Sequence, residues 1–372
     1  MSGSPTSSIP AEQLSAGVLS SSESSPQRGS ISGKAGDALG SAGDASRPTG
    51  PQPTGGHVPP PKELIGWVAR LEANINQVVL GKADTIQLCM VALLAGEHLL
   101  LEDVPGVGKT LLGKALARSV SGIFRRIQFT PDLLPADITG SSLYETHTGN
   151  FRFCEGPIFA NILLADEINR TTPRTQSALL EAMSERQVSV DGQTYPLPQP
   201  FLVIATQNPM EFEGTYPLPE SQMDRFLIRI SVGYPSRTEQ LKVLQTHRQG
   251  EPVEQLQPVL TCEQVLQLQS AVREVHVEES VAHYLLDIAQ TTRTCEELYV
   301  GVSMRGVLAY YRACQALAFL EGRGYVTPDD AKRLAAPVLA HRVIPKGYLH
   351  GSQRSAVEAL IQRLVEEVPV PT

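Results

Sequence analysis

A glycine-rich loop that ends in Lys-Thr is the stretch of this chain whose residue types and spacing point most directly to chemistry. It occupies residues 103–110 and reads DVPGVGKT. Backbone N–H groups in such a loop can bind phosphate oxygens, and the positive end of a following helix favours the anion. We expect Lys109 to reach the β- and γ-phosphates of a nucleotide and the Thr110 hydroxyl to bind Mg²⁺. The loop therefore predicts nucleotide binding.

The loop departs at one position from the usual pattern G-x-x-x-x-G-K-[ST]. Its first residue is Asp103 rather than glycine, and we expect Pro105 and Gly106 to supply the turn instead. The residues of this stretch that we assign to the nucleotide are Pro105, Gly106, Val107, Gly108, Lys109, Thr110 and Leu111.

Polar residues also follow two later apolar runs. Asp166 and Glu167 come directly after the run ILLA at 162–165. An aspartate at the carboxyl end of a strand can hold Mg²⁺ through its waters, and a glutamate there can polarise a water for attack on the γ-phosphate. Asn208 follows the run FLVIAT at 201–206 and could orient that water. This arrangement is typical of ATP hydrolysis.

The elements that must position these residues are short apolar strands alternating with helices. Apolar runs and helical periodicity predict strands at 98–101, 124–129, 162–165 and 201–206, and helices at 83–95 and 111–120. Apolar strands separated by helices form a parallel sheet with helices on both faces, an αβα sandwich. Ligands of such sheets bind at the carboxyl ends of the strands, where the polar residues fall.

Composition narrows the class of protein. The chain has 372 residues and a net charge of −8, which argues against nucleic acid as the main partner. Its five cysteines never form C-x-x-C, so we expect free thiols in a reducing compartment. No apolar run approaches the roughly twenty residues that a membrane-spanning helix needs. We therefore expect a soluble, cytoplasmic protein.

We divide the chain into three parts. Residues 1–61 are rich in Ser, Gly and Pro, and we predict a disordered tail there. A role for the tail as a tether or as a phosphorylated serine tract stays open. Residues 62–235 are predicted to form the αβα domain, and residues 236–372 a smaller domain of four or five helices. Helix starts are indicated by Ser236 with Glu239, Thr261 with Gln264, and Thr327 with Pro328.

Five motifs in a fixed order resemble the MoxR family of AAA+ ATPases. They are the phosphate loop, DEINR at 166–170, QSALLEAM at 176–183, ATQNP at 205–209 and LPESQMDRF at 218–226. The resemblance covers about residues 62–370. It implies a nucleotide-binding αβα domain followed by a helical lid, and a ring of protomers, a hexamer, with ATP at the seams. This group is also related to the ATPase subunits of magnesium chelatase.

The resemblance assigns roles residue by residue. Lys109 and Thr110 match the Walker A positions, Asp166 and Glu167 the Walker B pair, and Asn208 the sensor at a strand end. Nucleotide contacts are also assigned to Val79 and Gly81, in the connection before the helix at 83–95. ATP and Mg²⁺ are the implied cofactors.

Two arginines complete the assignment. Arg225 matches the arginine finger, which would reach the γ-phosphate of a neighbouring protomer. Arg170 and Arg174 are rival donors to the same seam, and a salt bridge of Arg225 with Asp224 or Glu220 is the structural alternative. Arg305 resembles the second sensor of the family, which touches the γ-phosphate and couples the lid to the nucleotide. The family usually carries Pro before this arginine, where this chain has Met304.

Two segments read as β-hairpins. Residues 143–153 alternate around Thr-Gly-Asn, and residues 187–197 contain Asp191-Gly192, a tight-turn pair. Both could cover an edge of the sheet. The resemblance instead implies hairpins that project from the ring and move with nucleotide state, and both interpretations stay open.

These observations predict a MoxR-type ATPase that hydrolyses ATP with Mg²⁺ in a ring and remodels or matures a partner protein. The family resemblance suggests a client or adaptor with a von Willebrand factor A domain. The alternatives are a nucleotide-gated binding module with little turnover and a motor subunit of a metal-chelatase-like complex. Neither a nucleic-acid partner nor a membrane span is expected.

Overall fold

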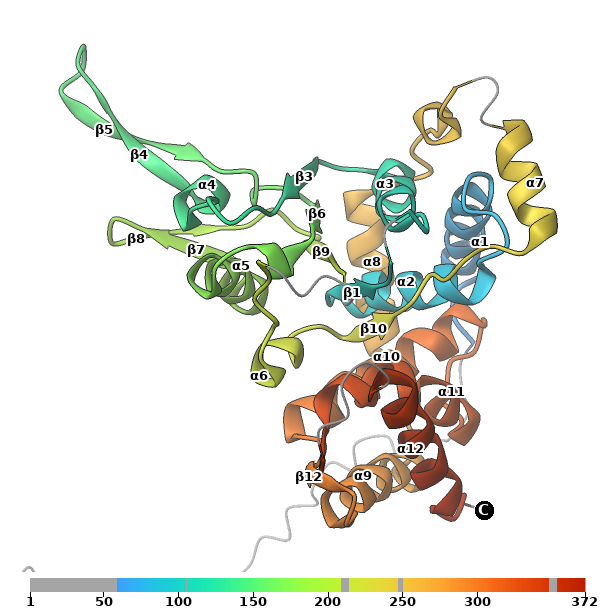
Figure 1. Ribbon diagram of the computed structural model, residues 1–372. Coiled ribbons are helices and arrows are strands. Elements are labelled where there is room, and N and C mark those ends of the chain that lie inside the picture. Colours follow the sequence, from blue (N-terminus) through green and yellow to red (C-terminus); the bar gives the residue numbers. More distant parts are fainter. Residues whose placement is uncertain (1–58, 105, 209–213, 247–249, 348–352, 372) are drawn as a thin grey trace, which may run out of the picture. The chain divides into compact units, whose positions relative to one another are not determined.

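The structure is a computed structural model that describes residues 59–104, 106–208, 214–246, 250–347 and 353–371 (Figure 1). The described residues form one unit by their internal contacts. The predicted tail at 1–61 lies almost entirely outside the described residues, as does Pro105.

A parallel sheet of five strands positions the candidate site. The strands stand in the order β10-β1-β9-β6-β3 and all pair in parallel. Their bounds are Leu99–Glu102 for β1, Phe124–Gln128 for β3, Ile162–Asp166 for β6, Leu202–Gln207 for β9 and Ile228–Ile230 for β10. The predicted strands are confirmed to within two residues at each end. The three central strands are continuous apolar runs because both of their faces are buried.

Helices cover both faces of the sheet, as Figure 1 shows, with α5 on one side and α1 to α3 on the other. These helices span Lys62–Asn76 (α1), Ala83–Ala95 (α2), Lys109–Ser119 (α3), Pro135–Thr139 (α4) and Pro173–Glu185 (α5). Alternate residues of β1 enter two cores: Leu99 and Leu101 join the core of α1 to α3, and Leu100 joins that of α5. The predicted αβα sandwich is confirmed.

Both predicted hairpins are present. Strands β4 (Gly140–Glu145) and β5 (Asn150–Glu155) form the first, and β7 (Gln187–Val190) and β8 (Gln193–Pro196) form the second. Asp191 and Gly192 have φ of 51° and 77°, as a two-residue turn with both central residues left-handed requires. The rings of Phe153 and Tyr195 stack with centroids 4.0 Å apart, so the two hairpins contact each other.

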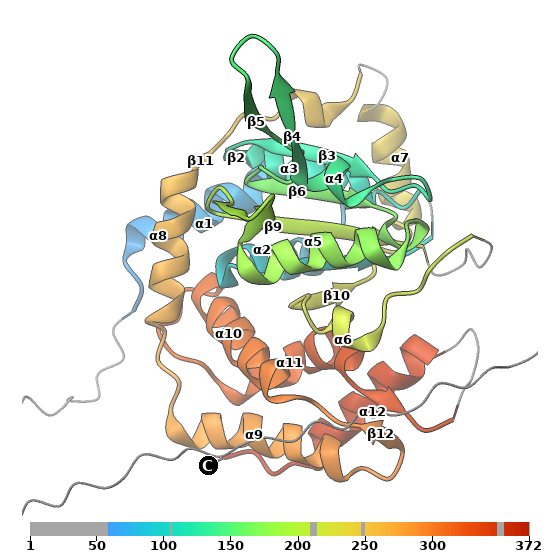
Figure 2. The ribbon, with the colours of Figure 1, turned by 90° about the vertical axis from the view of Figure 1, so that its left-hand side faces the viewer.

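The remaining elements are mostly helical (Figure 2). The α-helices are α6 (Glu220–Met223), α7 (Arg237–Thr246), α8 (Cys262–Arg273), α9 (Glu279–Thr294), α10 (Met304–Leu320), α11 (Pro328–Leu339) and α12 (Gln353–Glu367). The 3-10 turns are η1 (Ile168–Arg170), η3 (Pro252–Gln255) and η4 (Ala340–Arg342), and the short strands are β2 (Val120–Ser121), β11 (Leu260–Thr261), β12 (Leu298–Val300) and β13 (Ile344–Pro345).

The described residues after 235 therefore hold six α-helices, where the sequence predicted four or five. The predicted capping boxes are formed at Ser236 and Thr261. The hydroxyl of each accepts from the amide of Glu239 or Gln264, and the amide of each donates to the side chain of that same residue. Strand β11 pairs with β2, and α8 contacts both α2 and α10. These contacts join α8, which follows residue 235, to helices that pack on the sheet. The domain boundary at residue 235 stays a prediction.

Candidate nucleotide site

The phosphate loop lies between the end of β1 and the start of α3. Gly106 and Gly108 have φ of 83° and 97°, in the left-handed region that favours glycine. Helix α3 begins at Lys109, two residues before the predicted start, because Gly108 already turns the chain into it. The loop borders a cavity of ≈ 330 Å³ lined by Gly106, Gly108, Lys109, Thr110, Arg126, Gln128, Asp166, Glu167 and Thr206.

Lys109 is largely buried at this cavity, with 9% of its surface exposed. Its ammonium donates to the Asp103 carbonyl and, over 3.2 Å, to the Gln207 carbonyl. Desolvation lowers the pKa of Lys109, while the charges of Asp103, Glu167 and Asp166 oppose that shift. Two backbone carbonyls are weak partners for a partly desolvated cation, so an anionic phosphate is a favourable replacement.

Asp103 stands where the usual pattern has glycine, and the structure gives its carboxylate a definite place. One oxygen accepts from the Ser231 hydroxyl and from the Gly233 amide, each over 2.6 Å, and the other accepts from the Val104 amide over 2.8 Å. Burial opposes ionisation, but these hydrogen bonds hold the pKa of Asp103 below its usual value. Asp103 thereby ties the phosphate loop to the segment that follows β10.

Asp166 is 4% exposed at the carboxyl end of β6. Its carboxylate accepts from the Thr206 hydroxyl over 3.0 Å and from the Thr110 hydroxyl over 3.4 Å. Arg126 Nε lies 2.7 Å from the same carboxylate. The sheet register produces this pairing, since β3 runs beside β6.

These oxygens suit Mg²⁺. Among the described residues, no cluster of three or more His, Cys, Asp or Glu side chains could hold a metal ion by itself. Mg²⁺ that accompanies a nucleotide takes one or two protein oxygens and completes its shell with phosphate oxygens and waters. The neighbouring Thr110 hydroxyl and Asp166 carboxylate are such a pair of hard oxygen donors.

Glu167 has a left-handed backbone with φ of 58°, which is uncommon for a residue other than glycine and clusters at functional sites. Its amide donates to the Thr206 hydroxyl over 2.9 Å. Its carboxylate accepts from Gln128 over 2.9 Å and pairs with Arg170 over 3.0 Å. The side chain is thereby held at the mouth of the cavity, where a general base must lie.

Other predicted nucleotide contacts lie outside the lining of this cavity. Asn208 is 2% exposed, and its carbonyl accepts from Asn169 over 3.2 Å. Val79 and Gly81 lie in the connection between α1 and α2, where a side chain at Gly81 would collide with the Glu239 carboxylate. The predicted roles of Asn208, Val79, Gly81, Val107 and Leu111 stay predictions.

Three residues of the cavity were missed from the sequence: Arg126 and Gln128 on β3, and Thr206 at the end of β9. The signal for Thr206 was available, since it occupies the same strand end as Asn208. Arg126 and Gln128 sit in the run FRRIQ, where they are exposed on either side of the buried Ile127. Only the pairing of β3 with β6 places them beside Asp166 and Glu167.

Arg225 and Arg305 line a second cavity of ≈ 530 Å³ rather than the phosphate-loop cavity. Arg225 donates to the Leu180 carbonyl and to Ser184, and its buried Nε has no hydrogen-bond partner among the described residues. The second cavity is lined by Glu97, His98, Met183, Ser184, Arg186, Asp224, Arg225, Met304, Arg305, Leu308, Ala309, Arg312 and Arg342. This lining contains five arginines and two carboxylates, so its net charge is strongly positive.

The rival arginines have other places. Arg170 pairs with Glu167 of its own site, and Arg174 lies exposed on α5. Asp224 pairs with Arg342 at 2.8 Å, instead of with Arg225. Of the two structural alternatives for Arg225, an ion pair with Asp224 or with Glu220, the one with Asp224 is therefore not formed among the described residues.

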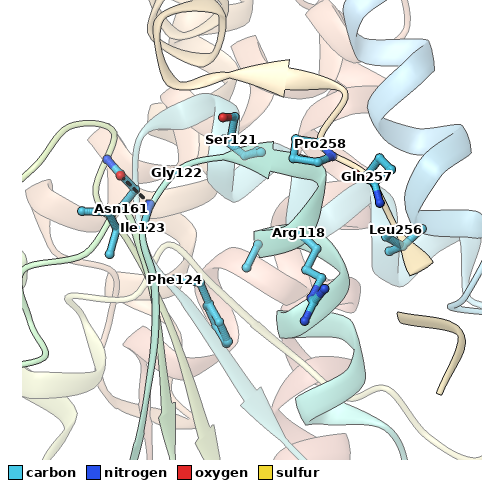
Figure 3. A pocket seen from close by; sticks show the side chains of 11 residues that line it. Arg118, Ser121, Gly122, Ile123, Phe124, Asn161, Leu256, Gln257 and Pro258 are labelled. Atoms are coloured by element: carbon cyan, nitrogen blue, oxygen red, sulfur yellow. Dashed lines mark hydrogen bonds between the residues drawn. The ribbon is translucent and has the colours of Figure 1, made fainter. Parts of the chain in front are cut away.

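A third cavity, of ≈ 710 Å³, lies at the amino ends of β3 and β6 (Figure 3). The Ile123 amide donates to Asn161 there over 2.9 Å. Arg118 is the charged residue of its lining, and Ile123, which lies beside Asn161, is 49% exposed. This lining contains no carboxylate, histidine or cysteine that could act with the Ser121 hydroxyl, so the cavity is not a candidate for catalysis.

Within the described residues, no helix is both long and apolar enough to cross a bilayer.

Comparisons with known proteins agree with the fold. The model of the ATPase family associated with various cellular activities (AAA) matches residues 98–228, and that of the AAA lid domain matches residues 290–364. A crystal structure of a candidate ATPase from Cytophaga hutchinsonii superimposes with a TM-score of 0.75 at 36% identity, covering 84% of this chain and 97% of that one. The fold and the phosphate loop thus define an AAA-type nucleotide-binding ATPase.

The relatives narrow the class to one family. Chaperone MoxR1 of Mycobacterium tuberculosis is 39% identical over 345 residues, which is 89% of this chain and 91% of MoxR1. The uncharacterized protein YeaC of Bacillus subtilis is 50% identical over 83% of this chain and 97% of its own length. The chain belongs to the MoxR family of AAA+ ATPases.

Proposed function

We propose that this protein binds ATP and hydrolyses it with Mg²⁺ at the seams of a ring of identical protomers. The predicted ring is a hexamer, and its motion would remodel or mature a partner protein. The observation that carries the shared seam is the separation of Arg225 from its own phosphate loop.

The charge of the second cavity supports this proposal. Glu97 pairs with Arg312 at 2.6 Å and Asp224 with Arg342 at 2.8 Å. These pairs account for both carboxylates of the lining, so Arg186, Arg225 and Arg305 are not neutralised by them. Guanidinium groups match phosphate oxygens in shape and charge. A triphosphate held by the phosphate loop of a neighbouring copy is therefore the ligand that this cavity suits.

In the proposed reaction, Lys109 and the loop amides would hold the phosphates, and Thr110 and Asp166 would hold Mg²⁺. Bound Mg²⁺ would supply neutralisation of the phosphate oxygens. Glu167 accepts a proton from the water that attacks the γ-phosphorus, and the bond to the bridging oxygen breaks in line. Arg225 of the next protomer stabilises the charge that develops in transfer, with Asn208 orienting the water.

The decisive experiment mixes two inactive variants. Arg225→Ala keeps its own site but lacks the finger, and Glu167→Gln keeps the finger but lacks the base. Each alone should lose turnover by about three orders of magnitude or to the detection limit. Mixed in equal amounts, they should regain turnover, because about one seam in four then joins an intact site to an intact finger. Turnover per protomer of the wild type should also rise steeply with protein concentration.

Two results would contradict the shared seam. The first is turnover that does not depend on protein concentration. The second is a mixture of Arg225→Ala and Glu167→Gln that is no more active than its parts.

The client is proposed from the relatives. The name Chaperone MoxR1 supports a chaperone-like role, and the family resemblance suggests a client with a von Willebrand factor A domain. Co-purification of such a protein with Glu167→Gln in ATP, and its release in ADP, would test this. We place the protein in the cytoplasm, where ATP is available.

A second candidate function is that of a motor subunit in a metal-chelatase-like complex. Magnesium-chelatase subunit ChlI of Chlorella vulgaris is 28% identical over 192 residues, 49% of this chain. Stimulation of metal insertion into a porphyrin by this protein and a chelatase partner would favour this candidate. Remodelling of a client without any metal transfer would favour the first.

A further inference from the structure

Arg342 is an enclosed arginine of the helical part, and its charge faces the segment that carries Arg225. Its side chain is 2% exposed, and its Nε lies 2.8 Å from the Asp224 carboxylate. Desolvation lowers the pKa of Arg342 to about 10, against the opposing effect of Asp224. Burying a guanidinium costs free energy unless every N–H donor has a hydrogen-bond partner. The partners of its other nitrogens therefore indicate which segment Arg342 holds in place.

Three of those partners are main-chain carbonyls within residues 224–227, and Nη1 also contacts His341 Nε2 at 2.8 Å. Arg342 donates to the carbonyls of Phe226 over 2.6 Å, Leu227 over 3.0 Å and Asp224 over 3.4 Å. A further donor bonds Val338, one helical turn back along the chain. The guanidinium of Arg342 therefore forms hydrogen bonds to the backbone on both sides of Arg225.

Helix α10 joins the same contact through its first turn. The Ser303 hydroxyl donates to the Asp224 carboxylate over 3.3 Å and caps α10 by accepting from the Gly306 amide over 3.0 Å. A side chain at Gly306 would lie 2.9 Å from Arg342 Cδ, so α10 packs directly on the stem of this arginine. Arg305 belongs to that turn.

We infer that Arg342 is a positioning residue: it locks the segment 224–227 to the lid, so that Arg225 and Arg305 face the neighbouring nucleotide as one unit. This inference rests on the proposed function. A shift of η4 relative to β10 moves Arg225, because the hydrogen bonds run to backbone atoms that flank it. The lid thus sets whether the finger is in place.

The test compares substitutions of two arginines in the lid, each of which forms several hydrogen bonds. Arg342→Lys keeps the charge, but an ammonium cannot reproduce the hydrogen bonds of the guanidinium to three carbonyls. Arg323→Lys is the matched control, since Arg323 grips the buried Asp330 carboxylate over 2.8 and 2.6 Å without contacting the segment of Arg225. Both variants are compared below their melting temperatures.

Arg342→Lys should lower kcat about 10- to 100-fold, the effect of a misplaced catalytic group, with the KM for ATP unchanged within about twofold. Arg323→Lys should keep wild-type turnover. Mixing Arg342→Lys with Glu167→Gln should restore turnover, because the Glu167→Gln protomer supplies a correctly held finger to an intact site. If Arg342→Lys does not fold, Ser303→Gly replaces it, since glycine is tolerated at a helix N-cap; we expect a fall of about threefold and the same rescue.

Separate outcomes overturn the inference and the shared seam. Wild-type kcat in Arg342→Lys would overturn the inference. So would a loss that Glu167→Gln cannot rescue although it rescues Arg225→Ala, because Arg342 would then serve its own site. If Glu167→Gln rescues neither variant, the shared seam itself fails and the inference falls with it.

Discussion

Arg126 Nε lies 2.7 Å from the Asp166 carboxylate, so the acid assigned to Mg²⁺ is paired with a cation from the neighbouring strand. Arg126 is half-exposed, whereas Asp166 is buried. Arg126 therefore competes with the metal for the same carboxylate oxygens. Mg²⁺ has to displace Arg126 from Asp166 or share the carboxylate with it.

Arg126→Ala tests this competition. An ion pair with one exposed partner contributes about 1 kcal/mol or less, so removing it should lower the Mg²⁺ concentration for half-maximal ATP hydrolysis about two- to fivefold. The measurement is a Mg²⁺ titration at saturating ATP. Arg125→Ala, at the adjacent exposed position of β3, is the control and should leave the titration unchanged. A higher Mg²⁺ requirement in Arg126→Ala would show that the arginine assists metal binding instead.

Asp103→Gly restores the residue that the usual phosphate loop carries, and we expect it to weaken ATP binding. The substitution removes the acceptor for Ser231, Gly233 and Val104. It also frees the loop, since glycine has more conformations to lose on binding. Hydrogen bonds to a charged group contribute about 1.5–3 kcal/mol. A part of this energy suffices to raise the Kd for ATP about tenfold.

Equilibrium binding of a fluorescent ATP analogue measures that effect. Ser231→Ala should give part of the loss, and the double variant Asp103→Gly with Ser231→Ala should be no worse than Asp103→Gly alone, because the two residues share one hydrogen bond. Unchanged affinity in Asp103→Gly would mean that the carboxylate does not order the loop.

Glu167→Gln separates catalysis from binding. Loss of a general base lowers kcat about 10²- to 10⁴-fold, while Lys109 and the loop still bind ATP. Isothermal titration should therefore give a Kd for ATP within about threefold of wild type, with steady-state turnover nearly abolished. If the turnover of Glu167→Gln equalled that of the wild type, Glu167 would not act as a base. That result would favour a nucleotide-gated binding module with little turnover.

The fold was predictable where one physical signal dominated. Strands β1, β6 and β9 are apolar because both faces are buried, and the turn at Asp191-Gly192 is specified by left-handed backbone angles. The helices after residue 235 were undercounted, because amphipathic periodicity alone does not fix where one helix ends and the next begins.

The same distinction applies to the site. The loop and the strand ends are recognisable from local sequence, and parallel pairing of the strands then brings Lys109, Thr110, Asp166 and Glu167 to one cavity. That Arg225 and Arg305 share a second cavity depends on contacts between residues about eighty positions apart, such as Ser303 with Asp224. No local pattern in the sequence encodes that packing.

Acid should destabilise the fold through His341. This residue is 2% exposed, and its ring contacts the Phe226 carbonyl over 2.9 Å. Desolvation and the nearby charges of Arg342 and Arg229 hold the pKa of His341 well below 6.5. The imidazole therefore stays neutral in the folded state but takes up a proton in the unfolded state as the pH falls through 6.5. The unfolded state then binds more protons, so stability is full above pH 6.5 and falls below it.

A His341→Gln variant measures this contribution. One proton corresponds to a loss of about 1.4 kcal/mol in the free energy of unfolding per pH unit, starting near pH 6.5. Urea denaturation between pH 7.5 and 5.5 should therefore show a shallower decline in His341→Gln than in the wild type. His98 is also buried with a lowered pKa, so part of the decline should remain. The exposed His283→Gln serves as the control and should keep the full wild-type slope. An equal slope in wild type and His341→Gln would mean that His341 is protonated in the folded protein, against the repulsion of the two arginines.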